Sequence, residues 1–112
     1  MPKTIVRTYS KYSREAMKLL GRMIRAGRKE SAMTEQELAT RAGVSRGLIQ
    51  RIEKGDMKCD VGIVFEAAYI VGIPLFDANQ ASLANHVQQT ESKLKLLPAS
   101  IRKTGKIIDD DF

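Results

Sequence analysis

The sequence predicts an all-α fold of five helices, and three observations support this. Apolar residues recur at helical spacing in five successive segments. Residues that typically begin or end helices flank these segments. Two of the segments are short and are joined by one glycine-containing turn. The length of 112 residues allows one domain with short appendages, and we expect an N-terminal arm over 1–12, the domain over 13–98 and a flexible tail over 99–112.

The first expected helix follows an extended segment. The β-branched and aromatic residues of Thr4–Tyr9 favour a short strand or an extended arm, and Ser13 is expected to be the N-cap of the helix. The apolar face of this helix is predicted to consist of Ala16, Leu19, Leu20, Met23 and Ile24. A basic stripe is expected to form a solvated surface on its other side, with Arg14, Lys18, Arg22, Arg25 and Lys29.

Two short helices are expected next. The segment Thr34–Glu37 predicts a capping box, in which the Thr34 hydroxyl accepts from the third amide of the helix and Glu37 accepts from the Thr34 amide. Gly43 ends this helix in a left-handed conformation. Ser45 is the N-cap of the next helix, which ends at Gly55. The core side of the pair is predicted to consist of Leu38, Ala39, Ala42, Val44, Ile49 and Ile52.

Two further helices complete the predicted fold. One starts near Asp60 and is closed by Gly72 and Pro74. The other opens with Asp77 and Gln80 as a cap pair and ends before Pro98. The apolar residues of the fourth helix are Ile63, Val64, Ala67, Ala68 and Val71.

The segment Thr34–Gly55 has the pattern of a helix-turn-helix. In such a unit the first helix crosses the DNA backbone, and the second enters the major groove by its N-terminal turn. The small residues Ala39 and Gly43 allow the two helices to approach closely. The outer side of the second helix then carries Arg46, Gly47, Leu48 and Arg51. A plain helical hairpin is the alternative interpretation.

The charge is concentrated in the N-terminal half of the chain. The formal net charge is +6, and residues 1–58 hold 14 basic and 6 acidic side chains whereas residues 59–112 hold 5 and 7. A basic half favours a polyanionic partner, of which nucleic acid is the commonest. The alternative is a charged surface that only confers solubility.

Several classes of protein are excluded by composition. A single cysteine, Cys59, and a single histidine, His86, can form neither a disulfide framework nor a zinc cage within one chain. We expect Cys59 to be a packed thiol and His86 to face solvent. The longest apolar stretch, Ala67–Phe76, is too short to span a bilayer, and the N-terminus has no apolar signal core, so we expect a cytoplasmic protein. No nucleophile–base pair and no glycine-rich phosphate loop is present, so we expect no enzymatic activity, cofactor or metal.

The segment Thr34–Gly55 resembles the Cro/C1-type (XRE) helix-turn-helix family. The similarity rests on the runs Glu37–Ala39, Ala42–Ser45 and Ile52–Gly55. The resemblance implies a five-helix DNA-binding domain that acts as a homodimer on a palindromic operator. It implies DNA contacts from Thr34, Gln36, Ser45, Arg46, Gly47, Leu48, Gln50, Arg51, Lys54 and Lys58.

Two positions depart from the family pattern. Glu35 stands where the family often has a glutamine that meets a phosphate and braces the first base-reading side chain. Either Gln36 substitutes for it or that contact is lost. Leu48 stands where a small polar residue is common, and it either touches a thymine methyl group or packs sideways on the domain.

A narrower resemblance links the chain to HipB-type antitoxins. It rests on Val44–Asp56, Val64–Ala68, Val71–Asp77, Leu96–Pro98 and a terminal Asp109–Phe112. It implies an autorepressor that also holds a HipA-type Ser/Thr kinase toxin inactive. The alternatives are a stand-alone phage-type or metabolic repressor, or a protein-interaction module that does not read DNA.

Two C-terminal segments are candidates for protein contacts. A two-heptad seam favours a dimer interface or packing on the same chain, and it consists of Leu83, Val87, Thr90, Leu94 and Leu97. The tail after Pro98 keeps apolar residues that are expected to contact the toxin, with a solubilising tail as the alternative: Ile101, Ile107, Ile108 and Phe112. The acidic run Asp109–Asp111 has the charge to hold magnesium but is expected to be solvated.

Overall fold

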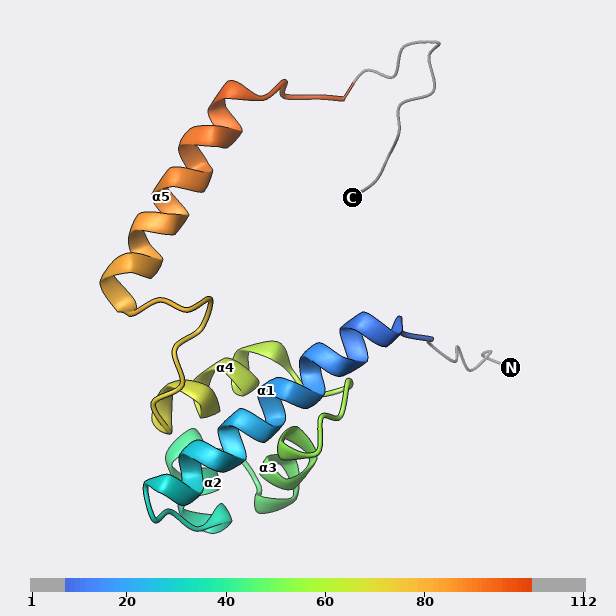
Figure 1. The fold of residues 1–112 in the computed structure, drawn as a ribbon, viewed down its shortest axis with the longest axis vertical. Coiled ribbons are helices and arrows are strands. Elements are labelled where there is room, and N and C mark those ends of the chain that lie inside the picture. Colours follow the sequence, from blue (N-terminus) through green and yellow to red (C-terminus); the bar gives the residue numbers. More distant parts are fainter. Residues whose placement is uncertain (1–7, 102–112) are drawn as a thin grey trace. The chain divides into compact units, whose positions relative to one another are not determined.

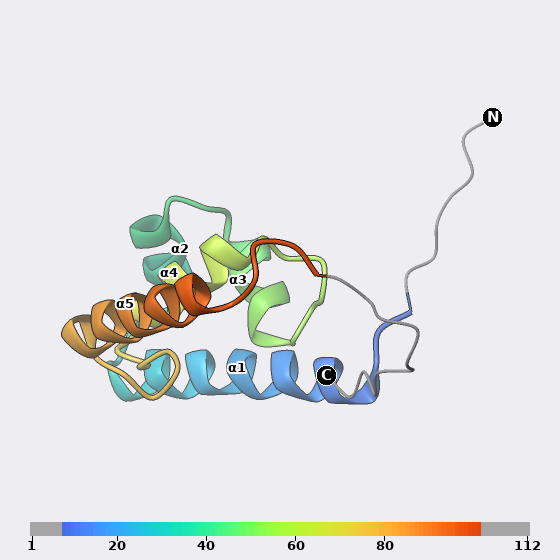
Figure 2. The ribbon, with the colours of Figure 1, turned by 90° about the horizontal axis from the view of Figure 1, so that it is seen from above.

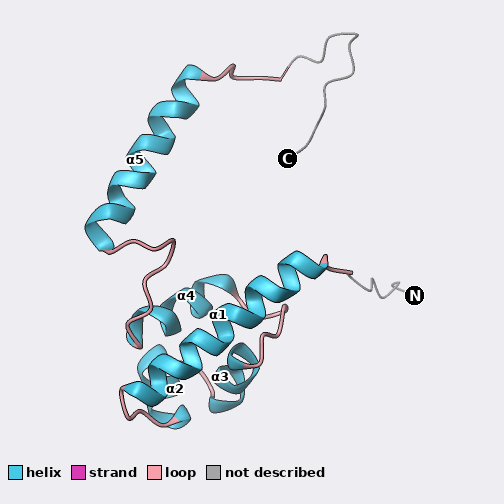
Figure 3. Cartoon of the chain, in the orientation of Figure 1, coloured by secondary structure: helices cyan, strands magenta, loops and turns pink. Residues whose placement is uncertain are grey.

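The computed structural model describes residues 8–101. This part of the chain contains five α-helices and no β-strand, as the sequence predicts (Figures 1 and 3). The chain divides between Asp77 and Ala78 into two compact units. The first unit holds α1–α4 and the second holds α5. The bounds are α1 Lys11–Glu30, α2 Glu35–Ala42, α3 Arg46–Glu53, α4 Val61–Ile70 and α5 Gln80–Leu96.

The start of α1 lies earlier than the sequence predicts. Ser10, not Ser13, is the N-cap, and its hydroxyl accepts a hydrogen bond of 3.1 Å from the Ser13 amide. The carbonyl of Ser10 already accepts from the amide of Arg14, so helical bonding begins there. The prediction of Ser13 was wrong because two serines three residues apart offer the same capping chemistry. Most of the predicted arm Thr4–Tyr9 lies outside the described residues.

The buried face of α1 also differs from the prediction. Ile24 is buried and Leu20 is half-buried as predicted, but the other three predicted positions are exposed, namely Ala16, Leu19 and Met23. Two glycines on α1 are buried instead, because the backbone of α1 lies directly against its neighbours. A Cβ on Gly21 would overlap the carbonyl oxygen of Ile52, and one on Gly27 would lie 3.0 Å from the carbonyl oxygen of Val71. Apolar periodicity does not detect a contact made by glycine.

The core of the first unit lies between α1 and the three following helices. Figure 2 shows α1 running along one side of α2, α3 and α4, and α1 packs against both α3 and α4. Most of the predicted core residues are confirmed, and each large one contributes about 1.5–3 kcal/mol by burial. The buried apolar cluster consists of Ile24, Met33, Leu38, Ala39, Ile49, Ile52, Val64, Ala67, Ala68 and Val71.

A buried ion pair joins the end of α1 to the end of α3. The Nε and Nη2 groups of Arg28 donate to the two carboxylate oxygens of Glu53 at 2.7 and 3.1 Å, and Nη1 donates to the carbonyl of Met33 at 2.9 Å. Arg28 is 7% exposed and Glu53 is 2% exposed. The hydrogen bond to Glu53 raises the pKa of Arg28 above its ordinary value. The Nη1 group of Arg22 also donates to the carbonyl of Glu53, at 2.7 Å.

The second unit contains α5. Its N-cap is Asn79, whose side-chain oxygen accepts from the Ser82 amide at 2.9 Å. The predicted Asp77–Gln80 cap pair was therefore wrong, because Asn79 directly precedes the helix and reaches its first turn. No residue of α5 is buried. The seam is half-buried at Leu83 and exposed at Val87, Thr90, Leu94 and Leu97.

The buried ion pair gives a stability prediction. Arg28→Met should lower the free energy of unfolding by about 3–5 kcal/mol, because Glu53 would remain buried without its cation. The double variant Arg28→Met plus Glu53→Met should recover most of this loss. Urea unfolding followed by far-UV circular dichroism measures both effects. Arg25→Met, at an exposed position of the same helix, is the control and should change stability little. An equal loss in the single and double variants would contradict the prediction.

Candidate nucleic-acid interface

The caps of α2 and α3 fix the turn between the two helices. The Thr34 hydroxyl accepts from the Glu37 amide at 3.0 Å, and the Glu37 carboxylate accepts from the Thr34 amide at 2.9 Å, so the predicted capping box is confirmed. The hydrogen bond from the Thr34 backbone lowers the pKa of Glu37. Gly43 has φ 71°, which satisfies the predicted left-handed turn. The Ser45 hydroxyl caps α3 by accepting from the Leu48 amide at 3.1 Å. Both cap hydroxyls therefore hold helix ends in place.

The N-terminal turn of α3 has an exposed side. Arg46 and Gly47 are exposed, as is Arg51 one turn on. A Cβ placed on Gly47 would meet only the Ser45 hydroxyl, at 4.0 Å, so the space outside the helix is open at this point. Leu48 is half-buried and packs against the core. This position supports the second of the two alternatives for Leu48, in which it packs sideways on the domain.

Glu35 connects α2 to the exposed side of α3. Its carboxylate oxygen Oε1 lies 3.6 Å from Nε of Arg46 and accepts a hydrogen bond from Nε2 of Gln50 at 3.2 Å. Gln36 instead donates to the Thr40 hydroxyl at 3.3 Å. Glu35, rather than Gln36, is therefore the residue of α2 that contacts Arg46. The carboxylate at position 35 holds two side chains of α3, an arrangement that the sequence analysis missed. The available signal was the opposite charge of the first residues of the two helices.

Arg51 is oriented by an acidic residue after α3. Its Nε donates to Oδ2 of Asp56 at 2.9 Å, and Oδ1 of Asp56 accepts from the Lys58 amide at 2.8 Å. The Lys58 hydrogen bond and then the Arg51 hydrogen bond lower the pKa of Asp56, and Asp56 in turn raises the pKa of Arg51. Since the carboxyl group titrates below its ordinary range, the Arg51–Asp56 pair stays ionised at neutral pH.

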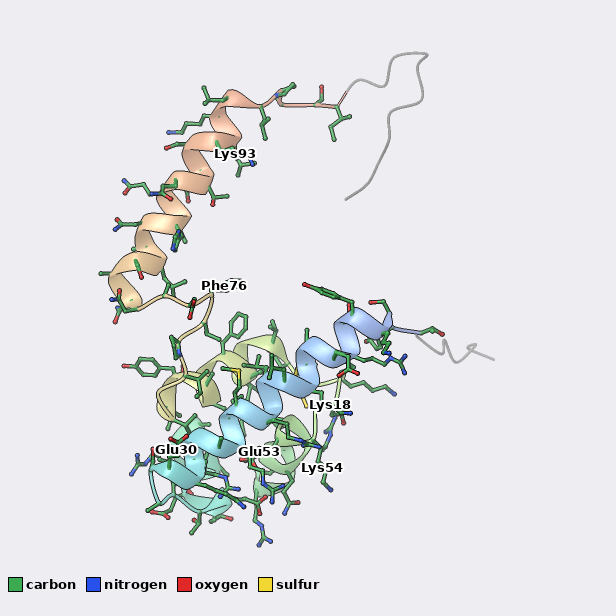
Figure 4. All side chains as sticks on the ribbon, in the orientation of Figure 1. Lys18, Glu30, Glu53, Lys54, Phe76 and Lys93 are labelled. Atoms are coloured by element: carbon green, nitrogen blue, oxygen red, sulfur yellow. The ribbon has the colours of Figure 1, made fainter. Side chains whose placement is uncertain are left out.

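A shallow basic hollow lies between the start of α1 and the end of α3. Gly55, at φ 85°, lets the chain pass the backbone of Lys18, because a Cβ on Gly55 would lie 2.9 Å from Cα of Lys18. Figure 4 shows Lys18 and Lys54 on the same side of α1. Part of the α1 basic stripe thus lies next to the predicted phosphate contact Lys54. The lining residues are Lys11, Arg14, Glu15, Lys18, Lys54, Gly55 and Met57.

The chain has a single cysteine and a single histidine. Cys59 is half-buried, and burial raises the pKa of its thiol, which favours the inert protonated form. His86 is exposed on α5.

Within residues 8–101, no cluster of three or more histidine, cysteine, aspartate or glutamate residues is arranged to hold a metal ion. None of the helices in this range combines the length and apolar character needed to cross a membrane. Asp109–Asp111 and the tail residues Ile107, Ile108 and Phe112 lie outside the described range.

Comparison with protein families identifies the central part of the chain. A family model described as Helix-turn-helix matches residues 24–74. These residues form a helix-turn-helix domain. The matched range runs from the second half of α1 through α4 and includes Glu35, Arg46 and Arg51. No curated protein is significantly similar to the chain in sequence. The match supports the Cro/C1-type (XRE) family and a DNA-binding transcription regulator.

Proposed function

We propose that this protein is a sequence-specific transcriptional repressor that binds a palindromic operator as a homodimer in the cytoplasm, and that it is the antitoxin of a HipA-type kinase toxin. The observation that carries the DNA-binding part is the exposed N-terminal turn of α3. Arg46 and Gly47 face solvent there, while the opposite side of the helix is held in the core by Ile49 and Ile52. This turn is the part of a helix-turn-helix that enters the major groove.

Four residues of α3 have a chemical function in this proposal. The guanidinium of Arg46 donates two hydrogen bonds to O6 and N7 of guanine. Gly47 lets the DNA approach the helix backbone, since the space outside it is open. Gln50 gives one amide hydrogen to Glu35, and its remaining N–H and its oxygen match the hydrogen-bonding edge of adenine. Arg51 contacts a base or a phosphate one turn further on.

Phosphate contacts surround this base-reading turn. Helix ends and cationic side chains bind phosphates without reading sequence. We assign phosphates to the α2 and α3 caps, to the polar side chain of Gln36 and to the basic residues after α3, with Lys18 of the basic hollow as an addition. These residues are Thr34, Gln36, Ser45, Lys54, Lys58 and Lys18.

The proposed contact of Arg46 predicts a loss of specificity. Arg46→Ala should weaken operator binding by about 1–3 kcal/mol and change binding to random DNA little. Fluorescence anisotropy with both DNAs measures the two affinities. Lys54→Ala is the matched control, because loss of a phosphate contact should weaken binding to both DNAs alike and reduce the salt dependence. If Arg46→Ala weakens both DNAs equally, Arg46 touches only phosphate. If the unmodified protein binds neither DNA, the protein-interaction module becomes the better interpretation.

We propose that Glu35 raises the selectivity of the interface. Its carboxylate contacts Arg46 and Gln50, and its negative charge weakens the binding of phosphates at the start of α2. At 4 Å in water this repulsion is about 1 kcal/mol. Random DNA, which offers only phosphates, experiences the repulsion without the compensating base contacts of Arg46.

This gives a second prediction on DNA binding. Glu35→Gln should tighten binding to random DNA by about fivefold and improve operator binding less, so the ratio of the two affinities falls. Glu30→Gln removes the same charge at an exposed position of α1 and should leave that ratio unchanged. A ratio that is equal in Glu35→Gln and the unmodified protein would show that Glu35 has no effect on selectivity.

The proposed dimer uses the seam of α5. Four apolar side chains at heptad spacing are half-buried or exposed in the single chain, and a 17-residue helix that buries none of its residues is marginal by itself. A second α5 would cover this seam. Two-fold pairing would place the two half-sites roughly 10 base pairs apart.

Substitution of the seam tests this dimer. Val87→Asp plus Leu94→Asp should convert the dimer to a monomer at low micromolar concentration, because two buried charges would face each other across the interface. Asn85→Asp plus Gln89→Asp, on the opposite face of α5, is the control and should leave the mass unchanged. Sedimentation equilibrium gives the mass, and a folded dimer in the first variant would exclude the seam.

The antitoxin part of the proposal rests on the tail and the HipB-type resemblance. Ile101, the last described residue, is 87% exposed, and further apolar residues follow it in sequence at Ile107, Ile108 and Phe112. A short segment of this kind can order on a partner, with an aromatic anchor in a pocket and acidic residues against basic groups.

Removal of residues 99–112 tests the tail. The truncated protein should bind operator DNA as well as the full chain, because the truncation leaves all proposed DNA contacts in place. It should bind the kinase encoded beside it more weakly and release toxicity in cells. Equal neutralisation by both forms would assign the contact to the helical body. If no kinase is encoded beside the gene, the stand-alone repressor is the better interpretation.

A further inference from the structure

Helix α1 has three distinct faces, one of which neither the core nor the proposed DNA surface uses. The first face is buried against the core, and the second carries the basic stripe. The third is apolar and exposed, with Tyr12 at 85%, Leu19 at 61% and Met23 at 37% exposure. Its members follow spacings of four, three, four and three residues, and they are Tyr12, Ala16, Leu19, Met23 and Ala26. This spacing is that of the apolar seam of a coiled coil.

The apolar face lies on the side of α1 away from the DNA-facing cations. Figure 4 shows Lys18 and Lys54 on one side of α1 and Phe76 on the other. Gly27 packs against Val71, so the end of α4 borders α1. After α4, the side chain of Phe76 is 77% exposed and makes an edge-to-face contact with Phe65 at a ring-centroid distance of 6.4 Å. An exposed apolar surface of this kind on a small domain is typical of an interaction site.

We propose that this face pairs α1 with α1 of a second copy of the chain, in antiparallel orientation about a two-fold axis. Antiparallel coiled-coil geometry then pairs Tyr12 with Met23 of the second copy, and Ala16 with Leu19 of the second copy. Each layer combines side chains of different size or shape. The central layers place a small residue against a large one, and the outer layers place a thioether against an aromatic ring, which is a favourable contact.

Charge complementarity supports a second copy as the occupant. Glu15 and Arg22 are exposed and flank the apolar face on the same side. In the antiparallel register, Glu15 of each copy faces Arg22 of the other, which gives two symmetric ion pairs. A parallel arrangement would place Glu15 against Leu20 and would lose both pairs. Nη1 of Arg22 donates to the carbonyl of Glu53 in its own chain, so the ion pair with Glu15 would use the other N–H groups of the guanidinium.

The proposed interface is small, because only residues within Tyr12–Met23 pair with residues of the second copy. We therefore expect a weak, reversible association. The α1 interface is separate from the α5 seam. Copies of the chain that use both surfaces therefore associate in two steps. The step through α5 occurs at low micromolar concentration, and the step through α1 occurs at higher concentration.

Charge reversal in the full-length chain tests the pairing. Sedimentation equilibrium up to several hundred micromolar should show a lower average mass for Glu15→Arg and for Leu19→Glu than for the unmodified protein. Combining Glu15→Arg with Arg22→Glu exchanges the charges and should restore the mass. Glu30→Arg makes the same charge change beyond the paired segment and should have no effect. Far-UV circular dichroism verifies that each variant is folded.

Site-directed crosslinking gives a second measurement that does not require a change of charge. With Cys59→Ser as background, chains carrying Ala16→Cys and chains carrying Leu19→Cys are mixed and treated with a short bismaleimide. Crosslinks between positions 16 and 19 of different copies should form, and they should persist when Val87→Asp plus Leu94→Asp is added to both chains. Unchanged mass in Glu15→Arg and Leu19→Glu, or absence of these crosslinks, would overturn the proposal. A different protein bound at this face would then be the better interpretation.

Discussion

The ion pair between Arg28 and Glu53 is the interaction on which the arrangement of the first unit depends. Two nearly inaccessible charges in an apolar core are tolerated only when each satisfies the other. Arg28 uses three of its N–H groups here, two on the Glu53 carboxylate and one on the carbonyl of Met33. One guanidinium thus fixes the end of α3 and the loop before α2 against α1. Together with the burial of Ile49 and Ile52, this contact sets the direction in which α3 presents its outer side.

Two arginines on the exposed side of α3 are each paired with a carboxylate. In the proposed interface Arg46 and Arg51 supply positive charge for DNA, and each is paired with a carboxylate, Glu35 in one case and Asp56 in the other. Both pairs are partly solvent-exposed, so each contributes little to folding stability. In the proposed interface their effect is on side-chain orientation and on the affinity for phosphates. An interface of this kind would restrain its cations before DNA arrives, and we propose that this favours selective binding over tight binding to any DNA.

Helix α1 separates three tasks by face. Its glycines bring the backbone of the buried face against α3 and α4, and its cations extend the basic surface beside Lys54. The third face is left apolar and exposed. Because successive residues of an α-helix point 100° apart, one helix can supply a core contact, an electrostatic surface and an association surface without conflict between them.

The sequence by itself determined the local features of this protein. The capping box of Thr34, the left-handed turn at Gly43 and the burial of Leu38 and Ile49 depend on neighbours within a few residues or on strong apolar periodicity, and all were predicted. Only the tertiary structure decided which face of α1 is buried, since glycine contacts carry no apolar signal. It also decided the pairs Arg28–Glu53 and Glu35–Gln50, which join residues 25 and 15 positions apart. Such contacts depend on how packed helices meet, and that geometry is set by the whole core.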